Sequence, residues 1–362
     1  MHTPNHRLSP TTGMYSGFLI TLAISFLIFY CTFQFQVWQP LQKYTLSDLP
    51  AHTQFVLNFS QHSTFPAYTL WYRLVHILSG FSLNYNSLAF TSIFLLSALV
   101  SVKYLLNYWI LNESAGNKIL VAIISLILIF VMPILTYFTQ ASHPSLYVAN
   151  RFHVYLGNIA PNQWHNATLI LAMPLNLIWF HYSVKHLDAK KLHYFLTMGV
   201  FGALSILCKP SYALAFLPII CSAILVINIK SKQYLTAVLK SILIAIPALL
   251  ILTYQWYFTF INNELFEHAQ KTVIAPFKVW GYYSPNLFIS LLISIMFPLL
   301  VLAFYYKKID RYLIIAWLTF FVALTIFSLV AEYPLFKSGN YRWSSIAANY
   351  ILFLFYARLL LQ

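Results

Sequence analysis

Charged residues are scarce in this chain, and acidic residues are the scarcest of all. Only 8% of the 362 residues are charged, and 7 Asp and Glu stand against 21 Lys and Arg. Because soluble domains contain about 25% charged residues, this deficit excludes an ordinary soluble fold. The hydrophobic fraction of 60% leads to the same conclusion. We therefore expect a single multi-pass membrane domain over residues 1–362.

Motifs for cofactors and metals are also missing. The sequence has no glycine-rich phosphate loop, no dinucleotide-binding fingerprint and no HExxH zinc motif, and its 3 cysteines lack metal-ligand spacing. We therefore predict neither an ATP-driven pump nor a resident cofactor, while a requirement for a divalent metal stays open. The net charge of +14 does not predict a nucleic-acid partner, because the basic residues are scattered between apolar runs.

The sequence is instead rich in apolar runs of membrane-spanning length. About 20 apolar residues are needed to cross the hydrocarbon core as a helix. The first run, residues 16–37, is too long for a signal-peptide core and is expected to be an anchor. The later runs lie at residues 86–107, 118–139, 166–182, 192–208, 211–229, 235–258, 286–306, 311–330 and 343–361. The sequence thus predicts an all-α bundle of about ten transmembrane helices.

The basic residues predict the orientation of this bundle. When alternate connections are placed on alternate sides, 13 of the 21 Lys and Arg fall on one side and 8 on the other. Short cytoplasmic connections are enriched in Lys and Arg, so both termini are predicted to be cytoplasmic. The long loops 38–85, 140–165, 259–285 and 331–342 then lie on the outer face. We expect the inner membrane of a bacterium, with the endoplasmic reticulum as the alternative.

A polar and aromatic segment lies between two apolar runs, at residues 150–168. Such a segment is costly to leave in lipid, so we expect a re-entrant or surface loop that lines a site. Its candidates for phosphate binding are Arg151 and His153. Its candidates for stacking on a sugar and hydrogen bonding to it are Trp164, His165 and Asn166. The alternative is a band of interfacial aromatic residues with incidental polar neighbours.

Two residues of the first outer loop have the chemistry of a general base. Asp48 and His52 are four positions apart, so a helix that starts near Asp48 would place them on one face. A carboxylate beside an imidazole can take the proton of an acceptor hydroxyl. The alternative is that Asp48 only caps the helix. Later in the same loop, residues 68–78 have the apolar spacing of an amphipathic helix at the membrane surface.

Four other residues of the outer loops are candidates for substrate binding. Lys209, between two apolar runs, would lie at the depth of a lipid phosphate, or would only snorkel to the surface. Glu264 and Glu267 share a helix face and could be a second carboxylate or metal ligands, or belong to a solvated helix. Arg342, before the last apolar run, could clamp a phosphate or pair with Glu332.

This layout resembles the polytopic membrane glycosyltransferases of the GT-C superfamily. Those enzymes have a cytoplasmic N-terminus, about ten helices and a long first outer loop with an acidic residue near its start. The corresponding residue here is Asp48. In the superfamily this acid is often one of two adjacent carboxylates, whereas here Leu49 follows it. The resemblance covers most of the chain as architecture and little of it as motifs.

The resemblance implies transfer of a sugar from a polyprenyl-phosphate-linked donor to an acceptor on the extracytoplasmic face. Asp48 would be the base, and His52 would assist it. The departing phosphate would be stabilised by three cations, Arg151, Lys209 and Arg342. The sugar would be held by Trp164, His165 and Asn166.

Three other functions are compatible with the sequence. A flippase or transporter of lipid-linked sugars would place ionisable residues at mid-membrane depth, but the apolar runs are nearly free of charge at their centres, with Lys103 and Lys240 towards their cytoplasmic ends, which counts against this function. A cell-surface polysaccharide polymerase would rely on outer arginines, which here are Arg73, Arg151 and Arg342. A non-catalytic scaffold subunit would need few carboxylates, as is the case here.

Overall fold

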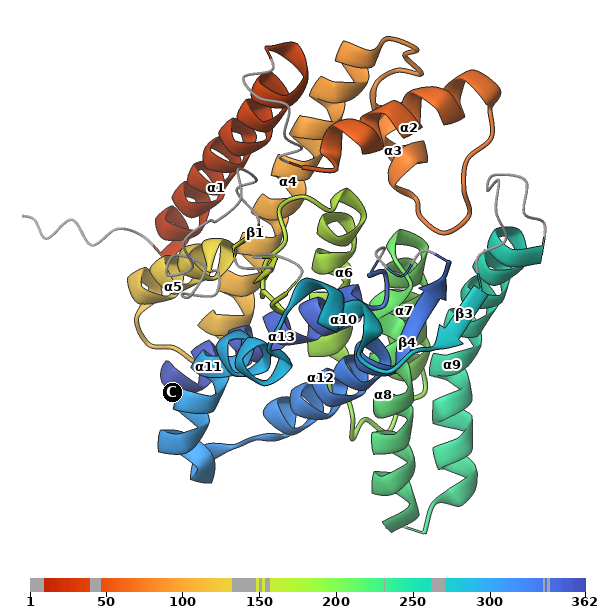
Figure 1. Ribbon diagram of the computed structural model, residues 1–362. Coiled ribbons are helices and arrows are strands. Elements are labelled where there is room, and N and C mark those ends of the chain that lie inside the picture. The colour runs from red at the N-terminus through yellow and green to blue at the C-terminus, as the bar shows by residue number, and fades with distance from the viewer. Residues whose placement is uncertain are drawn as a thin grey trace, which may run out of the picture.

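The computed structural model describes residues 10–39, 47–131, 148–149, 152–153, 157–230, 232–261, 271–334, 336 and 339–362. Within these residues the chain is almost entirely helical, as Figure 1 shows. Eight of the described helices are long and apolar enough to cross a membrane, and two shorter apolar helices lie among them. The predicted all-α membrane bundle is confirmed.

The bundle helices coincide with the predicted apolar runs. They are α1 (Pro10–Phe33), α4 (Tyr85–Asn112), α5 (Lys118–Phe130), α6 (Ala167–Lys185), α7 (His193–Cys208), α8 (Ser211–Lys230), α9 (Tyr234–Trp256), α11 (Leu287–Tyr305), α12 (Arg311–Leu329) and α13 (Arg342–Leu360). A π-helical turn, Gln34–Trp38, extends α1, and a second one, Tyr257–Ile261, extends α9. α5 ends at residue 130 instead of the predicted 139, and the segment 132–147 after it lies outside the described residues.

Polar side chains mark the starts of five bundle helices. The side chains of Asn84, Asn117, Asn166, Asn286 and Asp310 each accept a hydrogen bond from a backbone N–H in the turn that follows. The first N–H groups of a helix have no partner within the helix, so each such cap stabilises it by about 1 kcal/mol. These caps explain why the helices begin where polar sequence changes to apolar sequence.

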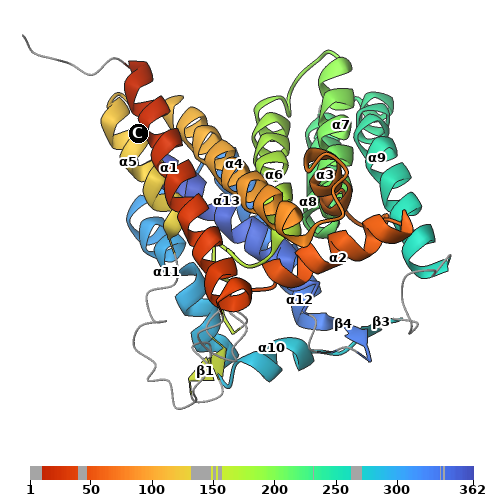
Figure 2. The same ribbon diagram turned by 90° about the horizontal axis from the view of Figure 1, so that it is seen from above.

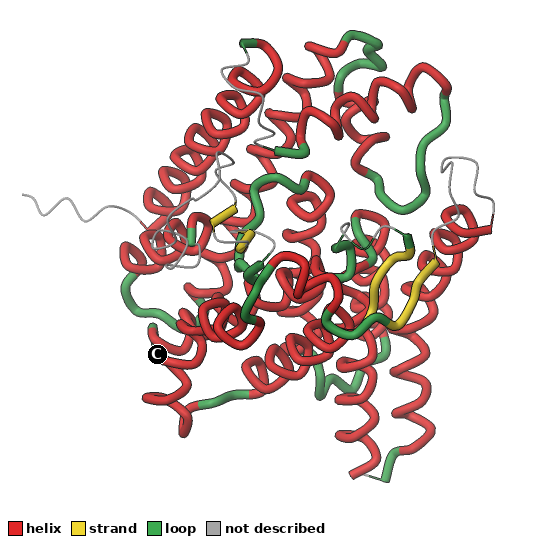
Figure 3. Tube along the Cα trace, in the orientation of Figure 1, coloured by secondary structure: helices red, strands yellow, loops and turns green. Residues whose placement is uncertain are grey.

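The two ends of the bundle differ, as Figure 2 shows. The first turn of α1 and the C-terminus lie at one end, whereas α2 (Leu49–His62) and α10 (Lys278–Tyr283) lie at the other. We call this second end the loop end. Two antiparallel strand pairs also lie there, drawn in yellow in Figure 3. They are β1 (Val148–Ala149) with β2 (Phe152–His153), and β3 (Lys271–Ile274) with β4 (Val330–Tyr333).

The amphipathic helix predicted in the first loop is α3 (Trp71–Leu78). Its buried face consists of Trp71, Tyr72 and Val75. Ile77 and Leu78, which belong to the predicted apolar stripe, are 53% and 58% exposed. The helix therefore has one apolar face against the protein and a second one turned outward, as suits a helix that lies between a bundle and lipid.

The loop that precedes α6 enters the bundle. Trp280 Nε1 donates a hydrogen bond to Gly157 O at 2.8 Å. Ile159 N donates to Ser294 Oγ at 2.8 Å, and Asn349 Nδ2 donates to Ile159 O at 2.6 Å. Irregular backbone at membrane depth is tolerated only when protein groups satisfy its hydrogen bonds, and side chains from α10, α11 and α13 do so here. The described part of the loop, residues 157–166, is thus buried within the bundle rather than superficial, and we call it the re-entrant loop.

Helices α7 and α9 pack closely at Gly199. A Cβ atom at Gly199 would lie 2.5 Å from Leu243 O and 3.1 Å from Ile244 O. Because backbone cannot move aside as a side chain can, we expect Gly199→Ala to destabilise the protein by about 1–3 kcal/mol and lower its thermal midpoint in detergent. Gly116→Ala is the control, since a Cβ at Gly116 has no atom within 4 Å. Equal midpoints for the two variants would show that this packing is wrong.

Candidate functional site

Lys209 lies at a tight corner between α7 and α8. The backbone carbonyl groups at the end of α7, just before Lys209, accept hydrogen bonds from the segment before α3. Thr69 Oγ1 donates to Cys208 O at 2.7 Å, and Leu70 N donates to Leu207 O at 2.9 Å. These bonds attach the first loop to the corner, so Lys209 and the first loop have fixed positions relative to each other.

The half-buried Lys209 ammonium has polar and aromatic neighbours. Lys209 Nζ donates to Thr168 Oγ1 at 2.7 Å and lies 5.4 Å from the centroid of the Trp343 ring. Desolvation lowers the pKa of Lys209 to about 7, and the nearby carboxylate of Glu332 opposes this shift. A lysine in this state gains or loses its charge near neutral pH and is stabilised in the charged form by any anion that approaches.

Arg342 is the first residue of α13 and is 1% exposed. Its guanidinium lies 5.1 Å from the centroid of the Trp343 ring. Its Nε, Nη1 and Nη2 atoms are buried and have no hydrogen-bond partner among the residues that the structure describes. A buried charge without partners is strongly unfavourable, and a guanidinium offers five N–H donors in a planar fork. The side chain is therefore poised to bind an anion.

Trp343 is the common neighbour of the two cations. His165 lies against it as well, with ring centroids 5.7 Å apart. Trp343 Nε1 donates to Asn340 Oδ1 at 3.3 Å. We call Lys209, Arg342, Trp343 and His165 the Trp343 cluster. The sequence predicted Lys209, Arg342 and His165 as candidates but not Trp343. The sequence signal for Trp343 is its position directly after an arginine at the start of a helix.

Asp48 and Arg342 both act on the phenol of Tyr283, on α10. Burial raises the pKa of the Tyr283 phenol, Arg342 opposes that rise and Asp48 adds to it, so both charges act on one hydroxyl. Asp48 is at the start of α2, but its carboxylate makes no capping hydrogen bond; Leu49 N donates to Ser47 Oγ instead. The capping alternative is therefore not realised. Desolvation raises the pKa of Asp48, which makes it a stronger base than an ordinary carboxylate.

His52 shares the first turns of α2 with Asp48, as predicted. His52 Nδ1 lies 3.0 Å from Tyr72 Oη, and no hydrogen bond or ion pair joins the His52 ring to the Asp48 carboxylate within the described part of the chain. Desolvation, and then the charge of Lys209, lower the pKa of His52 to about 4. The imidazole is thus neutral at pH 7 and near Lys209, and Tyr72 orients it.

Two of the predicted sugar ligands have other partners. The Trp164 ring packs against Phe130 and Phe29, with centroids 5.4 and 5.5 Å apart. Asn166 Oδ1 accepts from Leu169 N and Thr168 Oγ1, both at 2.9 Å, and so caps α6. Neither side chain has a hydrogen bond or ring contact with a described member of the Trp343 cluster, although Asn166 is linked to Lys209 through Thr168, which donates to Asn166 Oδ1 and accepts from Lys209 Nζ.

The remaining predicted residues fall outside what the structure describes. Arg151, Glu264 and Glu267 lie in the undescribed segments, and of His153 only the backbone, in β2, is described. No group of three or more His, Cys, Asp or Glu that could hold a metal ion is found among the described residues.

The fold defines this chain as a multi-pass membrane protein. No family model, no curated protein and no solved structure matches it.

Proposed function

We propose that the protein is a membrane glycosyltransferase that moves a sugar from a polyprenyl-phosphate-linked donor to an acceptor on the extracytoplasmic face. The observation that supports this most strongly is the buried, unpartnered guanidinium of Arg342 beside the Lys209 ammonium. A guanidinium matches the geometry of a phosphate, and a second cation completes the recognition of its charge. Because both cations lie at helix ends of a membrane bundle, the phosphate is that of a lipid.

The proposed reaction uses the neighbours of these cations. The Asp48 carboxylate accepts the proton of the acceptor hydroxyl as the hydroxyl oxygen bonds to the anomeric carbon. The bond from that carbon to the phosphate oxygen breaks, and its electron pair stays on the departing polyprenyl phosphate. Lys209 and Arg342 stabilise the negative charge that develops there. Of the predicted sugar-binding residues, His165 packs against Trp343 and is therefore proposed to lie beside the donor.

The loop end is extracytoplasmic in this proposal. The short connections at the opposite end include Lys190, Lys191, Lys307 and Lys308. Short cytoplasmic connections are enriched in such residues. The donor phosphate would thus meet the enzyme at the outer leaflet.

The pH dependence of binding tests the role of Lys209. We expect purified wild-type protein in nanodiscs to bind the polyprenyl-phosphate-linked sugar, a phosphodiester whose charge does not change near pH 7, tightly below pH 7 and more weakly as the pH rises through 7. Lys209 is protonated below its pKa of about 7 and loses its charge above it. Lys209→Gln should bind weakly across the range, with no change near pH 7. The matching polyprenol, which lacks the phosphate, is the control ligand. An equal pH profile for wild type and Lys209→Gln would contradict this role.

Chemical analysis of the donor distinguishes transfer from transport. A flippase returns the lipid-linked sugar intact, whereas a transferase leaves polyprenyl phosphate. A polysaccharide polymerase would also release the lipid, but its product would grow with time. Each alternative thus has its own mass-spectrometric signature in the same reaction.

A further inference from the structure

Another buried cation, which is not part of the Trp343 cluster, lies inside the bundle. Lys103, on α4, is 8% exposed. Its Nζ donates to Asn162 Oδ1 at 2.6 Å and lies 3.4 Å from the centroid of the Tyr350 ring. No carboxylate lies within ion-pair distance of Lys103 in the described ranges of the chain. Burying an ammonium without a counter-charge is strongly unfavourable in a membrane protein.

The acceptor on Asn162 is held in place. Asn162 Nδ2 donates to Leu128 O and to Val131 O, both at 2.9 Å, at the end of α5. Since both N–H groups of the amide are used in this way, its oxygen must face Lys103. One ammonium hydrogen is thus fixed on Asn162 and the aromatic face of Tyr350 lies nearby, which leaves Lys103 donor capacity to spare.

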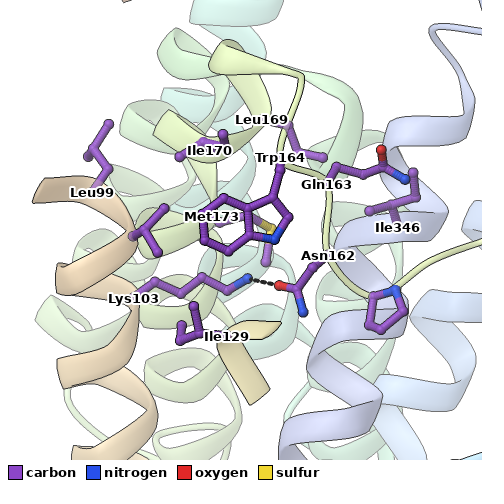
Figure 4. A pocket seen from close by; sticks show the side chains of 12 residues that line it. Leu99, Lys103, Ile129, Asn162, Gln163, Trp164, Leu169, Ile170, Met173 and Ile346 are labelled. Atoms are coloured by element: carbon purple, nitrogen blue, oxygen red, sulfur yellow. Dashed lines mark hydrogen bonds between the residues drawn. The ribbon is translucent and has the colours of Figure 1, made fainter. Parts of the chain in front are cut away.

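A small cavity adjoins the lysine, as Figure 4 shows. Its lining is mostly apolar and comes from α4, α5, α6, α13 and the re-entrant loop. The polar exceptions are Lys103, Asn162, Gln163 and Trp164. Figure 4 shows the indole nitrogen of Trp164 on the edge of the ring that is turned toward the Lys103–Asn162 pair. This N–H has no acceptor among the described residues. Two donors, an ammonium and an indole N–H, therefore converge on one cavity.

The size of the cavity limits its ligand. Its volume is about 30 Å³. On this scale a single water molecule needs roughly 10–15 Å³, so the space suits one small anion, of which a halide is the simplest, and is too small for a sugar. Gln163 also lines the cavity. It is 6% exposed, and neither its amide nitrogen nor its amide oxygen has a hydrogen-bond partner among the described residues.

We propose that this cavity binds a monatomic anion of chloride size, held by the Lys103 ammonium and the Trp164 indole N–H. The anion neutralises Lys103 within the bundle. It also joins α4 to the re-entrant loop that leads to His165 of the Trp343 cluster. The site needs neither a lipid phosphate nor a sugar, so it stands independently of the proposed function.

Thermal stability in different salts tests the site. We expect chloride or bromide to raise the thermal midpoint of the purified wild-type protein by about 2–4 °C over gluconate at equal ionic strength, because a ligand of the native state stabilises it. Lys103→Met and Trp164→Phe should lose this halide-specific shift. Lys240→Met is the matched control, since Lys240 is also a buried lysine on a bundle helix, and it donates to an asparagine oxygen, Asn228 Oδ1, at 3.1 Å. Lys240→Met should keep the shift.

Anomalous diffraction from bromide-soaked wild-type crystals gives a test that needs no variant. We expect a bromide peak between Lys103 Nζ and Trp164 Nε1. A cavity without a peak, or a halide-specific shift that persists in Lys103→Met, would overturn the proposal. A shift lost equally in Lys240→Met would do so too, since it would reflect a general effect of removing a buried lysine.

Discussion

Arg342→Met is expected to weaken binding of a polyprenyl monophosphate about 100-fold or more while leaving the thermal midpoint unchanged or raised. Removing one partner of a buried charged pair costs several kcal/mol of binding free energy. The free protein should not suffer in the same way, because the guanidinium nitrogens have no hydrogen-bond partner among the described residues. Replacing an unpartnered buried charge by an apolar side chain of similar length removes an unfavourable burial.

This combination of outcomes separates a binding role from a structural one. If Arg342 only held α13 in place, Arg342→Met would lower the midpoint and binding together. Arg342→Lys should recover binding only in part, because an ammonium cannot reproduce the planar fork of a guanidinium. Arg73→Ala is the matched control, since Arg73 is an exposed arginine on α3. Its removal should leave binding within about twofold of wild type.

Asp48→Asn is expected to abolish sugar transfer, with a loss of about 10²–10⁴-fold in rate, and to leave binding of the lipid phosphate intact. The amide cannot accept the proton of the acceptor hydroxyl, yet it has almost the same shape. Structural damage should be small, because the Asp48 carboxylate makes no capping bond to α2. Transfer and binding are measured on the same nanodisc preparation, so the two effects can be compared directly.

The control for Asp48→Asn is a carboxylate at the opposite end of the bundle. Asp188 forms an exposed ion pair with Arg311 at 2.6 Å, and such pairs contribute at most about 1 kcal/mol. Asp188→Asn should therefore leave transfer unchanged. Wild-type rates in Asp48→Asn would show that another group is the base, and equal losses of binding and transfer would show that Asp48 acts in donor binding.

The helices were predictable because their cause is local. A helix is forced on any long apolar segment in lipid, since every backbone polar group must find a partner within the segment. The asparagine and aspartate caps are equally local. The end of α5 was not predictable, because the carbonyls of Leu128, in its last turn, and of Val131, just after it, accept from Asn162 of the re-entrant loop.

The site could be predicted in part. Lys209 and Arg342 are single polar residues at the ends of apolar runs on the same predicted face, and the structure brings both to Trp343. Adjacent residues of the re-entrant loop have different neighbours, because Trp164 packs against Phe130 while His165 packs against Trp343. Spacing along a chain cannot reveal which helix a loop side chain will meet.

The partner of His52 illustrates the same limit. The four-residue spacing predicted a helix that starts near Asp48, and α2 begins at Leu49 with Asp48 as its N-cap residue. The imidazole nevertheless lies against Tyr72 of α3, at 3.0 Å, because the attachment of the first loop to α7 places α3 beside α2. A tertiary contact of this kind overrides a helical neighbour and leaves no trace in local periodicity.

The most direct test of the proposed function is the fate of a polyprenyl-phosphate-linked sugar in proteoliposomes that contain the purified protein and a total extract of envelope lipids as acceptor. We predict that mass spectrometry will detect polyprenyl phosphate and a new glycosylated product with wild-type protein, and neither with Asp48→Asn or Arg342→Met. An intact donor that has only changed leaflet, or equal conversion by all three proteins, would contradict sugar transfer at the Trp343 cluster.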